Sequence, residues 1–413
     1  MLAKMLRTSF NNLMYVHNNK NQKQNGGGEQ LSIDMFLSNE QRLFQDIVRQ
    51  FAKNELAHDA VQRANNDHID ETTMNKIVDM GLMGIMIPES DGGQGGTLVD
   101  AILAIMAVAL SCPRSADFVQ AGNFGAIRTF AAFASQTQKE RWLHGLLKGR
   151  LLMSVGMSEP EAGSAVTDLQ TSLTPDGEGF RLNGTKVFGT HSATADIILA
   201  YARFGPGVHG IGSVIVEKNM DGFSTGQSVR YMNGEKWAQL YFDNVYIPKE
   251  NILLGPGGFK KQISGFNVER LGNAARAVAV GRHAFNVART HAKMRHQFGR
   301  PLCEFQGIQW KFADMSVKLD AAELMLINAA ISAGSDLPGA YDTAATKLLC
   351  NEAGYFAANE ALQVMGALGF GEDNIVQYCM RRTRGWMIAG GTLEILRNRI
   401  AEHVFDQRFS QRP

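Results

Sequence analysis

The hydrophobic positions in the first third of the chain repeat with a helical period. Phe44, Val48 and Phe51 are spaced i, i+4 and i+7, and they follow the segment 38–41, whose Ser-Asn-Glu-Gln sequence suits a helix N-terminus. The run 98–110 is apolar on all sides, and its length favours a buried helix over a strand. This part of the chain is therefore predicted to be helical.

Near Met153 the pattern changes to short segments rich in β-branched and aromatic residues. Such segments occur at 197–201, 214–216 and 240–245, and turn-forming residues separate them. Asn183-Gly184 stands between two further segments of this kind. Because both residues accept a positive φ, the pair predicts a hairpin turn.

A helical period returns after Phe259 and persists to about Phe405. Strands do not alternate with helices along the chain, which argues against a doubly wound parallel sheet. We therefore expect an α+β multi-domain protein with its strands in the middle. The expected domains are an N-terminal helical domain, a central β domain and a C-terminal helical domain, over 35–152, 153–258 and 259–407. Residues 1–34 are interpreted as a disordered extension, with a presequence as the alternative.

Composition excludes several classes of protein. The 413 residues include 41 Lys and Arg against 40 Asp and Glu, so the net charge of +1 lacks the basic surplus of a nucleic-acid binder. The longest uncharged apolar run, between Asp100 and Arg114, is shorter than the roughly 20 residues of a membrane span. The four cysteines form no CxxC pair, and no two histidines are spaced i, i+4. We expect buried thiols, no metal site and a reducing compartment: a bacterial cytoplasm, or alternatively the mitochondrial matrix.

Three segments together carry a family resemblance. They are Val-Gly-Met-Ser-Glu-Pro-Glu-Ala-Gly-Ser at 155–164, Met-Arg-His-Gln-Phe-Gly-Arg-Pro at 294–301, and Gln-Val-Met-Gly-Ala-Leu-Gly at 363–369. With the order of the domains, they make the chain resemble the acyl-CoA dehydrogenase family of flavoproteins over about residues 38–406. The resemblance implies a central β-barrel or sandwich, a C-terminal four-helix bundle and FAD as the cofactor.

Removing a proton from the carbon next to a thioester needs a carboxylate of raised basicity in a dry site. Many members of the family carry this Glu just before a Gly-Thr pair, where this chain has Gly390. The segment 267–271, Asn-Val-Glu-Arg-Leu, instead resembles the isovaleryl-CoA and long-chain acyl-CoA dehydrogenase branches, which implies Glu269 as the base. The local pattern alone is typical of a solvated helix face, since Glu269, Asn273 and Arg276 share one side.

The resemblance also implies which residues bind the flavin and the thioester. Around the flavin ring it implies Val155, Met157, Ser158, Ser164, Phe188, Gly189 and Thr190. For the rest of FAD it implies Arg295, Gln297, Phe298 and Gln306, completed from a neighbouring subunit by Gln363, Gly366 and Ala367, with Thr392 and Glu394 also near the cofactor. For the substrate it implies Ser164, Asn267, Arg270 and Gly391, with Arg270 in contact with the CoA phosphates and Asn267 nearby, and the backbone N–H of Gly390 for the thioester oxygen.

The activity implied is formation of a trans-2-enoyl-CoA in fatty acid or amino acid catabolism. The implied partners are an acyl-CoA and an electron-transfer flavoprotein, and the implied assembly is a homotetramer. Alternatives are an enoyl-CoA reductase, a desulfinase-like lyase and a flavin-free protein without catalysis. The desulfinase branch lacks a base on the helix of Glu269 and carries an Arg in the glycine-rich loop where this chain has Gln94, so both residues argue against that branch. The chain departs from the family pattern at Ala165, at Phe188 in place of a frequent Trp, and at Arg382 in place of an Asp.

Overall fold

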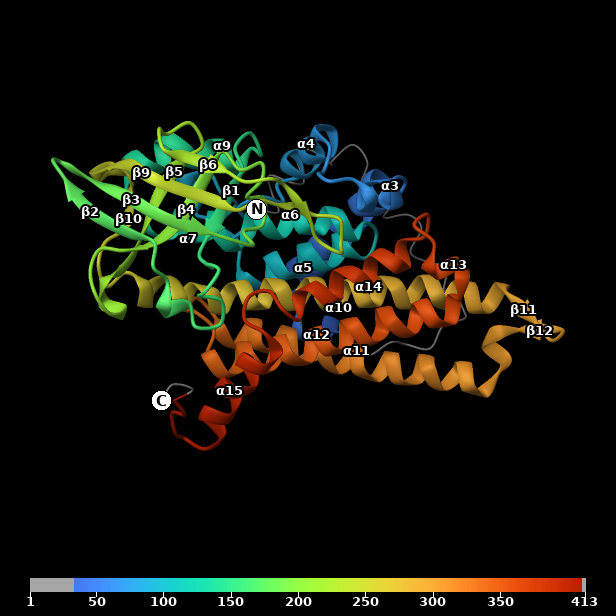
Figure 1. Ribbon diagram of the computed structural model, residues 1–413. Helices are drawn as coiled ribbons and strands as arrows, with labels where there is room; N and C mark the ends of the chain where they lie inside the picture. Colours follow the sequence, from blue (N-terminus) through green and yellow to red (C-terminus); the bar gives the residue numbers. More distant parts are fainter. Residues whose placement is uncertain (1–32, 411–413) are drawn as a thin grey trace.

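The first part of the protein forms a helical layer, as the hydrophobic pattern predicts. The computed structural model describes residues 33–410 (Figure 1), so most of the predicted extension lies outside the described residues. The side chain of Ser38 accepts from the Gln41 backbone N–H and caps α2 (Asn39–Phe51). The apolar run forms the buried helix α5 (Leu98–Ala109). The layer also contains α3 (Ala60–Asn65), α4 (Glu71–Asp79), α6 (Pro113–Asn123), α7 (Gly125–Phe133), α8 (Gln136–Gln138) and α9 (His144–Leu147).

The central strands form one curled sheet. Their order is β10-β5-β4-β2-β3-β9-β6, with β1 paired to β4. Strands β5 and β9 are not neighbours in this order, yet Val214 and Ile247 share one buried cluster, so the sheet curls over its own interior. The strands are β1 (Met153–Gly156), β2 (Ser172–Asp176), β3 (Gly179–Lys186), β4 (Ile197–Arg203), β5 (Ile211–Glu217), β6 (Phe223–Thr225), β9 (Leu240–Pro248) and β10 (Ile252–Leu254), with β7 (Val229–Arg230) and β8 (Lys236–Trp237) as a separate ribbon.

The hairpin turn predicted at Asn183-Gly184 is wrong. These residues lie inside β3, and the β2–β3 connection falls at Gly177 and Glu178. Gly184 has a φ of +148° and lies where the β3–β9 register shifts. A Cβ there would come 2.4 Å from Thr171 Oγ1. The glycine therefore permits a bulge and a close approach, and neither gives a local signal different from that of a turn.

A long helix, α10 (Phe259–Met294), connects the β domain to the C-terminal bundle. It approaches α12 (Ala340–Met365) closely at Gly281, where an added Cβ would lie 2.7 Å from Gly354 Cα. The bundle is completed by α11 (Gln306–Ala333), α13 (Ala367–Phe370), α14 (Ile375–Trp386) and α15 (Leu393–Val404), and the small hairpin β11 (His296–Gln297) and β12 (Arg300–Pro301) lies at its far end (Figure 1).

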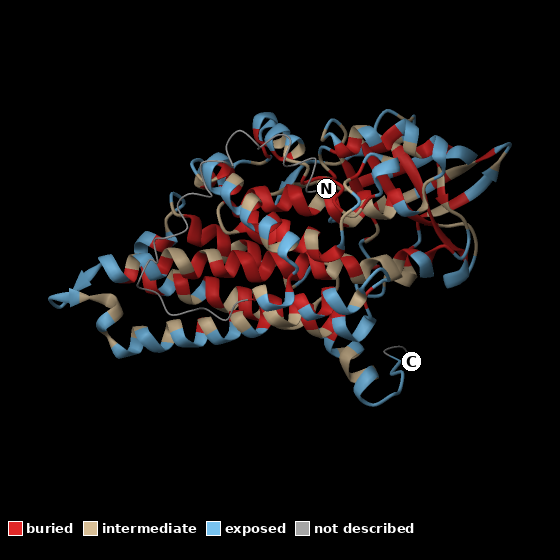
Figure 2. Ribbon diagram, turned by 180° about the vertical axis from the view of Figure 1, so that it is seen from behind, coloured by how far each residue is buried: buried red, intermediate tan, exposed pale blue. Residues whose placement is uncertain are grey.

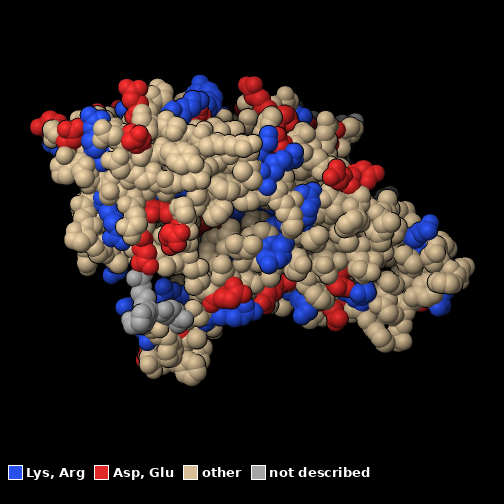
Figure 3. All heavy atoms as spheres, in the orientation of Figure 1, with Lys and Arg blue, Asp and Glu red and all other residues tan. Residues whose placement is uncertain are grey.

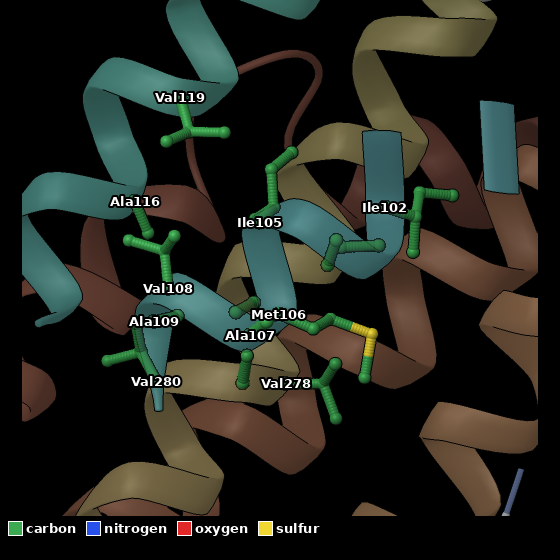
Figure 4. Packing of buried hydrophobic residues seen from close by; sticks show 14 of the residues in the cluster. Ile102, Ile105, Met106, Ala107, Val108, Ala109, Ala116, Val119, Val278 and Val280 are labelled. Carbon is green, nitrogen blue, oxygen red and sulfur yellow. The ribbon is translucent and has the colours of Figure 1, made fainter. Parts of the chain in front are cut away.

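The largest core joins the first helical layer to the bundle. Isoleucines of α5, such as Ile102 and Ile105, belong to the same buried cluster as Val278 and Val280 of α10 (Figure 4). Buried residues run along the middle of α10, while its last turn and the hairpin are exposed (Figure 2). Within residues 33–410, no helix combines the length and the apolarity of a membrane span.

Candidate active site

Glu269 lies on α10, and its carboxylate faces α6 and α7. Gln120 of α6 donates from Nε2 to Glu269 Oε1 at 2.7 Å. Glu269 Oε2 is buried and has no side-chain hydrogen-bond partner among the described residues, while the Gly125 backbone N–H also acts on this carboxylate. A Cβ added to Gly125, the first residue of α7, would lie 3.4 Å from that oxygen.

The environment of Glu269 makes its carboxylate basic. Burial raises its pKa, and the Arg276 cation and the Gln120 amide oppose this rise only in part. Asn273 and Arg276, which share its helix face, are themselves buried. The solvated-face interpretation is therefore wrong, and the same side of α10 faces the protein interior.

A turn of two glycines follows α14. Gly390 and Gly391 have φ values of +72° and +95°, which side chains rarely adopt. Arg270 donates from Nε to the Gly390 carbonyl at 3.3 Å, and Lys347 donates from Nζ to the Gly391 carbonyl at 2.8 Å. The Lys347 ammonium also acts on Glu269, and burial lowers the pKa of Lys347 to about 7. One lysine therefore lies close to both the turn and the basic carboxylate.

Two loops of the β domain meet beside β1. Val187 donates its N–H to the Ser158 carbonyl at 2.9 Å, and the Ser154 hydroxyl donates to the Thr190 carbonyl at 2.7 Å. Between them, a Cβ on Gly189 would lie 2.9 Å from Ser154 Oγ, so this approach requires glycine. The structure thus brings the segments 155–158 and 188–190 together, as the resemblance implies.

Phe188 presents an open aromatic face in this region. It is 58 % exposed, and its φ is +61°. The Trp237 ring lies beside it at a centroid distance of 4.6 Å. Trp237 therefore adds aromatic surface next to Phe188, which stands where a larger Trp is frequent in the family, although the two ring planes are tilted by 52° to each other.

The turn 159–164 is held by a buried ion pair. Lys186 donates to Glu159 Oε1 at 2.6 Å, and Glu159 also accepts the backbone N–H groups of Gln170 and Thr171. Ser164 is exposed on this turn. Ser164 is therefore accessible on the surface of the chain, and its contact with a thioester stays a prediction.

Arg382 belongs to a buried ion cluster. Its Nη2 lies 2.9 Å from Asp117 Oδ1, and its Nη1 donates to Glu235. Arg276 lies 3.0 Å from Asp117, and Arg114 lies 2.8 Å from Glu235. The cluster explains the charge reversal at position 382, since two carboxylates from other domains surround it.

The ion cluster reaches the glycine turn through Trp386. The Arg276 and Arg382 guanidinium groups each lie 4.8 Å from the centre of the Trp386 ring. The Trp386 carbonyl accepts from Lys347 at 3.2 Å and from Asn351 at 2.6 Å. Trp386, which directly precedes the 387–391 segment, is therefore held through both its side chain and its backbone carbonyl.

The predicted nucleotide-binding residues lie far from Glu269 in the same chain. Arg295, Gln297 and Phe298 are exposed at the β11–β12 hairpin, and Phe298 is 94 % exposed. The rest of α10, at 1.5 Å per residue, places this hairpin roughly 40 Å from Glu269. At the same end of the bundle the structure exposes Gln306, Gln363, Gly366 and Ala367. Thr392 instead caps α15, and Glu394 is exposed in its first turn.

Several residues of this site were not predicted. Gln120, Lys347 and Trp237 carry no local motif, because each reaches the site from an element distant in sequence. Figure 3 shows the molecule hollowed between the β domain and the bundle, with Lys and Arg side chains beside the hollow. No group of His, Cys, Asp and Glu in the described part of the chain is arranged to hold a metal ion.

The three domain models of the acyl-CoA dehydrogenase family match this fold and site: the N-terminal domain over 38–150, the middle domain over 154–245 and the C-terminal domain over 256–405. The chain therefore belongs to the acyl-CoA dehydrogenase family of FAD-dependent flavoenzymes.

Among its relatives, a 3-sulfinopropanoyl-CoA desulfinase of Paraburkholderia xenovorans (strain LB400) is 33 % identical over 91 % of this chain and 98 % of its own. An acyl-CoA dehydrogenase of Bacillus subtilis (strain 168) is 32 % identical over 90 % of this chain and 99 % of its own. The structure of butyryl-CoA dehydrogenase from Megasphaera elsdenii superposes with a TM-score of 0.83 at 29 % identity, covering 89 % of this chain and 99 % of that one.

Proposed function

We propose that the protein oxidises an acyl-CoA thioester to a trans-2-enoyl-CoA, with Glu269 as the base. The observation that carries this proposal is the Glu269 carboxylate, whose Oε2 is buried beside the start of α7 and whose pKa is raised by burial. A carboxylate of raised basicity is suited to take a proton from carbon.

The open surfaces of the chain fit FAD. Phe188 and Trp237 offer aromatic surface beside the joined 155–158 and 188–190 loops, which present Val155, Met157, Ser158, Gly189 and Thr190. The exposed Phe298 ring and the Arg295 cation suit an adenine and a pyrophosphate. Because these two surfaces lie far apart in one chain, we infer that they complete each other between subunits of a homo-oligomer, proposed to be a tetramer.

The residues of this chain divide the work on the substrate. Glu269 takes the proton from the carbon next to the thioester. The N–H groups of Gly390 and Gly391 have no acceptor within residues 33–410, and the neighbouring carbonyls are held by Arg270 and Lys347. The Gly390 N–H therefore polarises the thioester oxygen from a fixed position. FAD, when bound, supplies the oxidant that takes the hydride from the next carbon, and an electron-transfer flavoprotein is the proposed acceptor of the electrons.

A desulfinase-like reaction is the second candidate. It is favoured by the similarity to 3-sulfinopropanoyl-CoA desulfinase. It is also favoured by Gly390, which supplies no carboxylate at the position where many members of the family carry the base. The basic Glu269 carboxylate favours oxidation, because carbon–sulfur cleavage has no need of a base at this carbon.

The deciding experiment is a panel of thioesters with the purified enzyme and an artificial electron acceptor. Butyryl-CoA, isovaleryl-CoA, glutaryl-CoA and 3-sulfinopropanoyl-CoA sample short, branched, anionic and sulfinate acyl groups. We expect at least one acyl-CoA to bleach the flavin under anaerobic conditions. Sulfite release without acceptor reduction would establish the desulfinase reaction instead.

Glu269→Gln tests the base directly. The variant should bleach its flavin at least ~100-fold more slowly with the best substrate, because general-base catalysis is lost while the shape of the side chain is kept. Stopped-flow absorbance gives the rate, and Glu178→Gln, a change of an exposed carboxylate in the β2–β3 turn, is the matched control. Bleaching at the wild-type rate would exclude Glu269 from the proton transfer.

A further inference from the structure

Arg128 and Glu269 both lie where α7 and α10 face each other, one helical turn apart. Helices α7 and α10 face each other here, so that Gly125 meets Glu269 and Arg128 meets Gly265. A Cβ added to Gly265 would lie 4.0 Å from Arg128 Nη1. Gly265 precedes Glu269 by one turn of α10, which is about 6 Å along the helix axis.

The packing of α7 directs Arg128 towards α10. The opposite face of α7, formed by Ala126, Ile127 and Phe130, packs into the core that contains β1 and β4. Gly125, Arg128 and Ala132 lie on the remaining face by helical spacing. The cation of Arg128, which lies on this face, is therefore placed between α7 and α10.

The Arg128 guanidinium has no ion-pair or hydrogen-bond partner in the described part of the chain. It is half-buried, and its partial burial lowers its pKa with no carboxylate to compensate. Arginines in similar positions are paired: Arg270 with Gly390 and Asn267, and Arg276 with Asp117. An unpaired cation beside an active site calls for an anion brought by the ligand.

The change in exposure along α7 and α10 indicates which part of a thioester this anion belongs to. Along α7 the facing residues change from half-buried at Gly125 and Arg128 to exposed at Ala132. Along α10 they change from buried at Asn273 to exposed at Lys261. Arg128 therefore lies on the solvent side of Glu269, where the long, charged end of the substrate must leave, while the acyl group occupies the interior.

We propose that Arg128 binds a phosphate of the CoA moiety and thereby selects phosphorylated thioesters over thioesters of the bare pantetheine arm. This inference rests on the proposed acyl-CoA substrate, and it assigns to Arg128 the phosphate contact expected of Arg270. Arg270 instead holds the Gly390 carbonyl. Lys261, exposed on the same side of α10, adds a second positive charge at the mouth.

The test compares the binding of butyryl-CoA and butyryl-pantetheine by titration calorimetry. Arg128→Gln should weaken butyryl-CoA about 10- to 100-fold, since a charge-assisted hydrogen bond is lost, and leave butyryl-pantetheine unchanged. Arg128→Lys should restore part of the affinity, and Arg150→Gln, at an exposed site after α9, should match the wild type. Binding is measured without turnover, so the result stands even if the oxidation proposed above fails.

Three outcomes would overturn the assignment. Equal weakening of butyryl-CoA and butyryl-pantetheine would place Arg128 on the acyl or pantetheine part. A larger loss for glutaryl-CoA than for butyryl-CoA would show that the anion is an acyl carboxylate. Unchanged affinity for all three ligands would show that Arg128 contacts no part of the substrate.

Discussion

At the scale of a single residue, the burial that raises the basicity of Glu269, the proposed base, also acts against folding. Burial raises its pKa, so the folded protein keeps the proton at pH values where the unfolded chain has released it. The associated stability is fully present below the unfolded pKa and is lost as the pH rises through the raised folded value. Above that pH the folded protein contains an ionised carboxylate whose burial lowers the free energy of unfolding.

This linkage predicts a pH-dependent difference between wild type and Glu269→Gln. The neutral amide carries no ionisation cost, so the variant should be the more stable protein at pH 8 and no more stable at pH 4. Urea unfolding at several pH values measures the difference. A constant difference in unfolding free energy across this range would contradict a raised pKa.

The same titration predicts the pH dependence of the reaction. Only the ionised carboxylate accepts a proton, so the bleaching rate should rise with pH and level off above a midpoint higher than the ordinary pKa of 4.5 for Glu. Stopped-flow rates at saturating thioester give this midpoint. A midpoint at or below the ordinary value would show that burial does not control Glu269.

At the scale of elements, the ion cluster joins parts of the chain that are distant in sequence. Asp117 and Arg114 come from α6, Glu235 from the turn between β7 and β8, Arg276 from α10 and Arg382 from α14. The cluster holds more guanidinium groups than carboxylates, and Glu269 is the next carboxylate along the face of α10. The ion cluster therefore joins the domains, and through Arg276 it also lowers the pKa of Glu269.

Arg382→Asp would restore the acid common in the family, yet it should destabilise this protein. The new carboxylate would face Asp117 and Glu235 without a cation of its own, and the disruption of a buried pair costs about 3–5 kcal/mol. Chemical denaturation measures the loss, and Arg384→Asp, at an exposed position of the same helix, should change stability far less. Equal effects of the two substitutions would contradict a special role for the cluster.

At the scale of the whole molecule, the exposed β11–β12 hairpin lies too far along α10 to serve the same chain's Glu269 site. We expect Phe298→Ser to lower FAD occupancy although no residue near Glu269 changes, because the hairpin is proposed to complete the site of another subunit. The flavin-to-protein absorbance ratio and the mass in light scattering measure the outcome. Full occupancy in a monomeric protein would exclude a shared site.

Much of the architecture follows from local pattern. The Ser38 cap, the buried run that forms α5 and the order of helices and strands are encoded by neighbours in the sequence. Gly184 shows the limit: a glycine that avoids Thr171 across the sheet has the same local signature as a glycine in a turn. Most of the cysteines are buried as expected, while Cys303 is only half-buried.

The sequence by itself determined the family and the order of helical and β regions, and it indicated Glu269 rather than position 390 as the candidate base, because motif spacing and side-chain type are properties of the chain alone. Tertiary structure decided the rest. Burial raises the pKa of Glu269, and Gln120 and Lys347 interact with its carboxylate. Arg382 forms ion pairs with buried carboxylates, while Arg128 has no ion-pair partner among the described residues. Burial and ion pairing depend on elements brought together from distant positions, and no local pattern records those contacts.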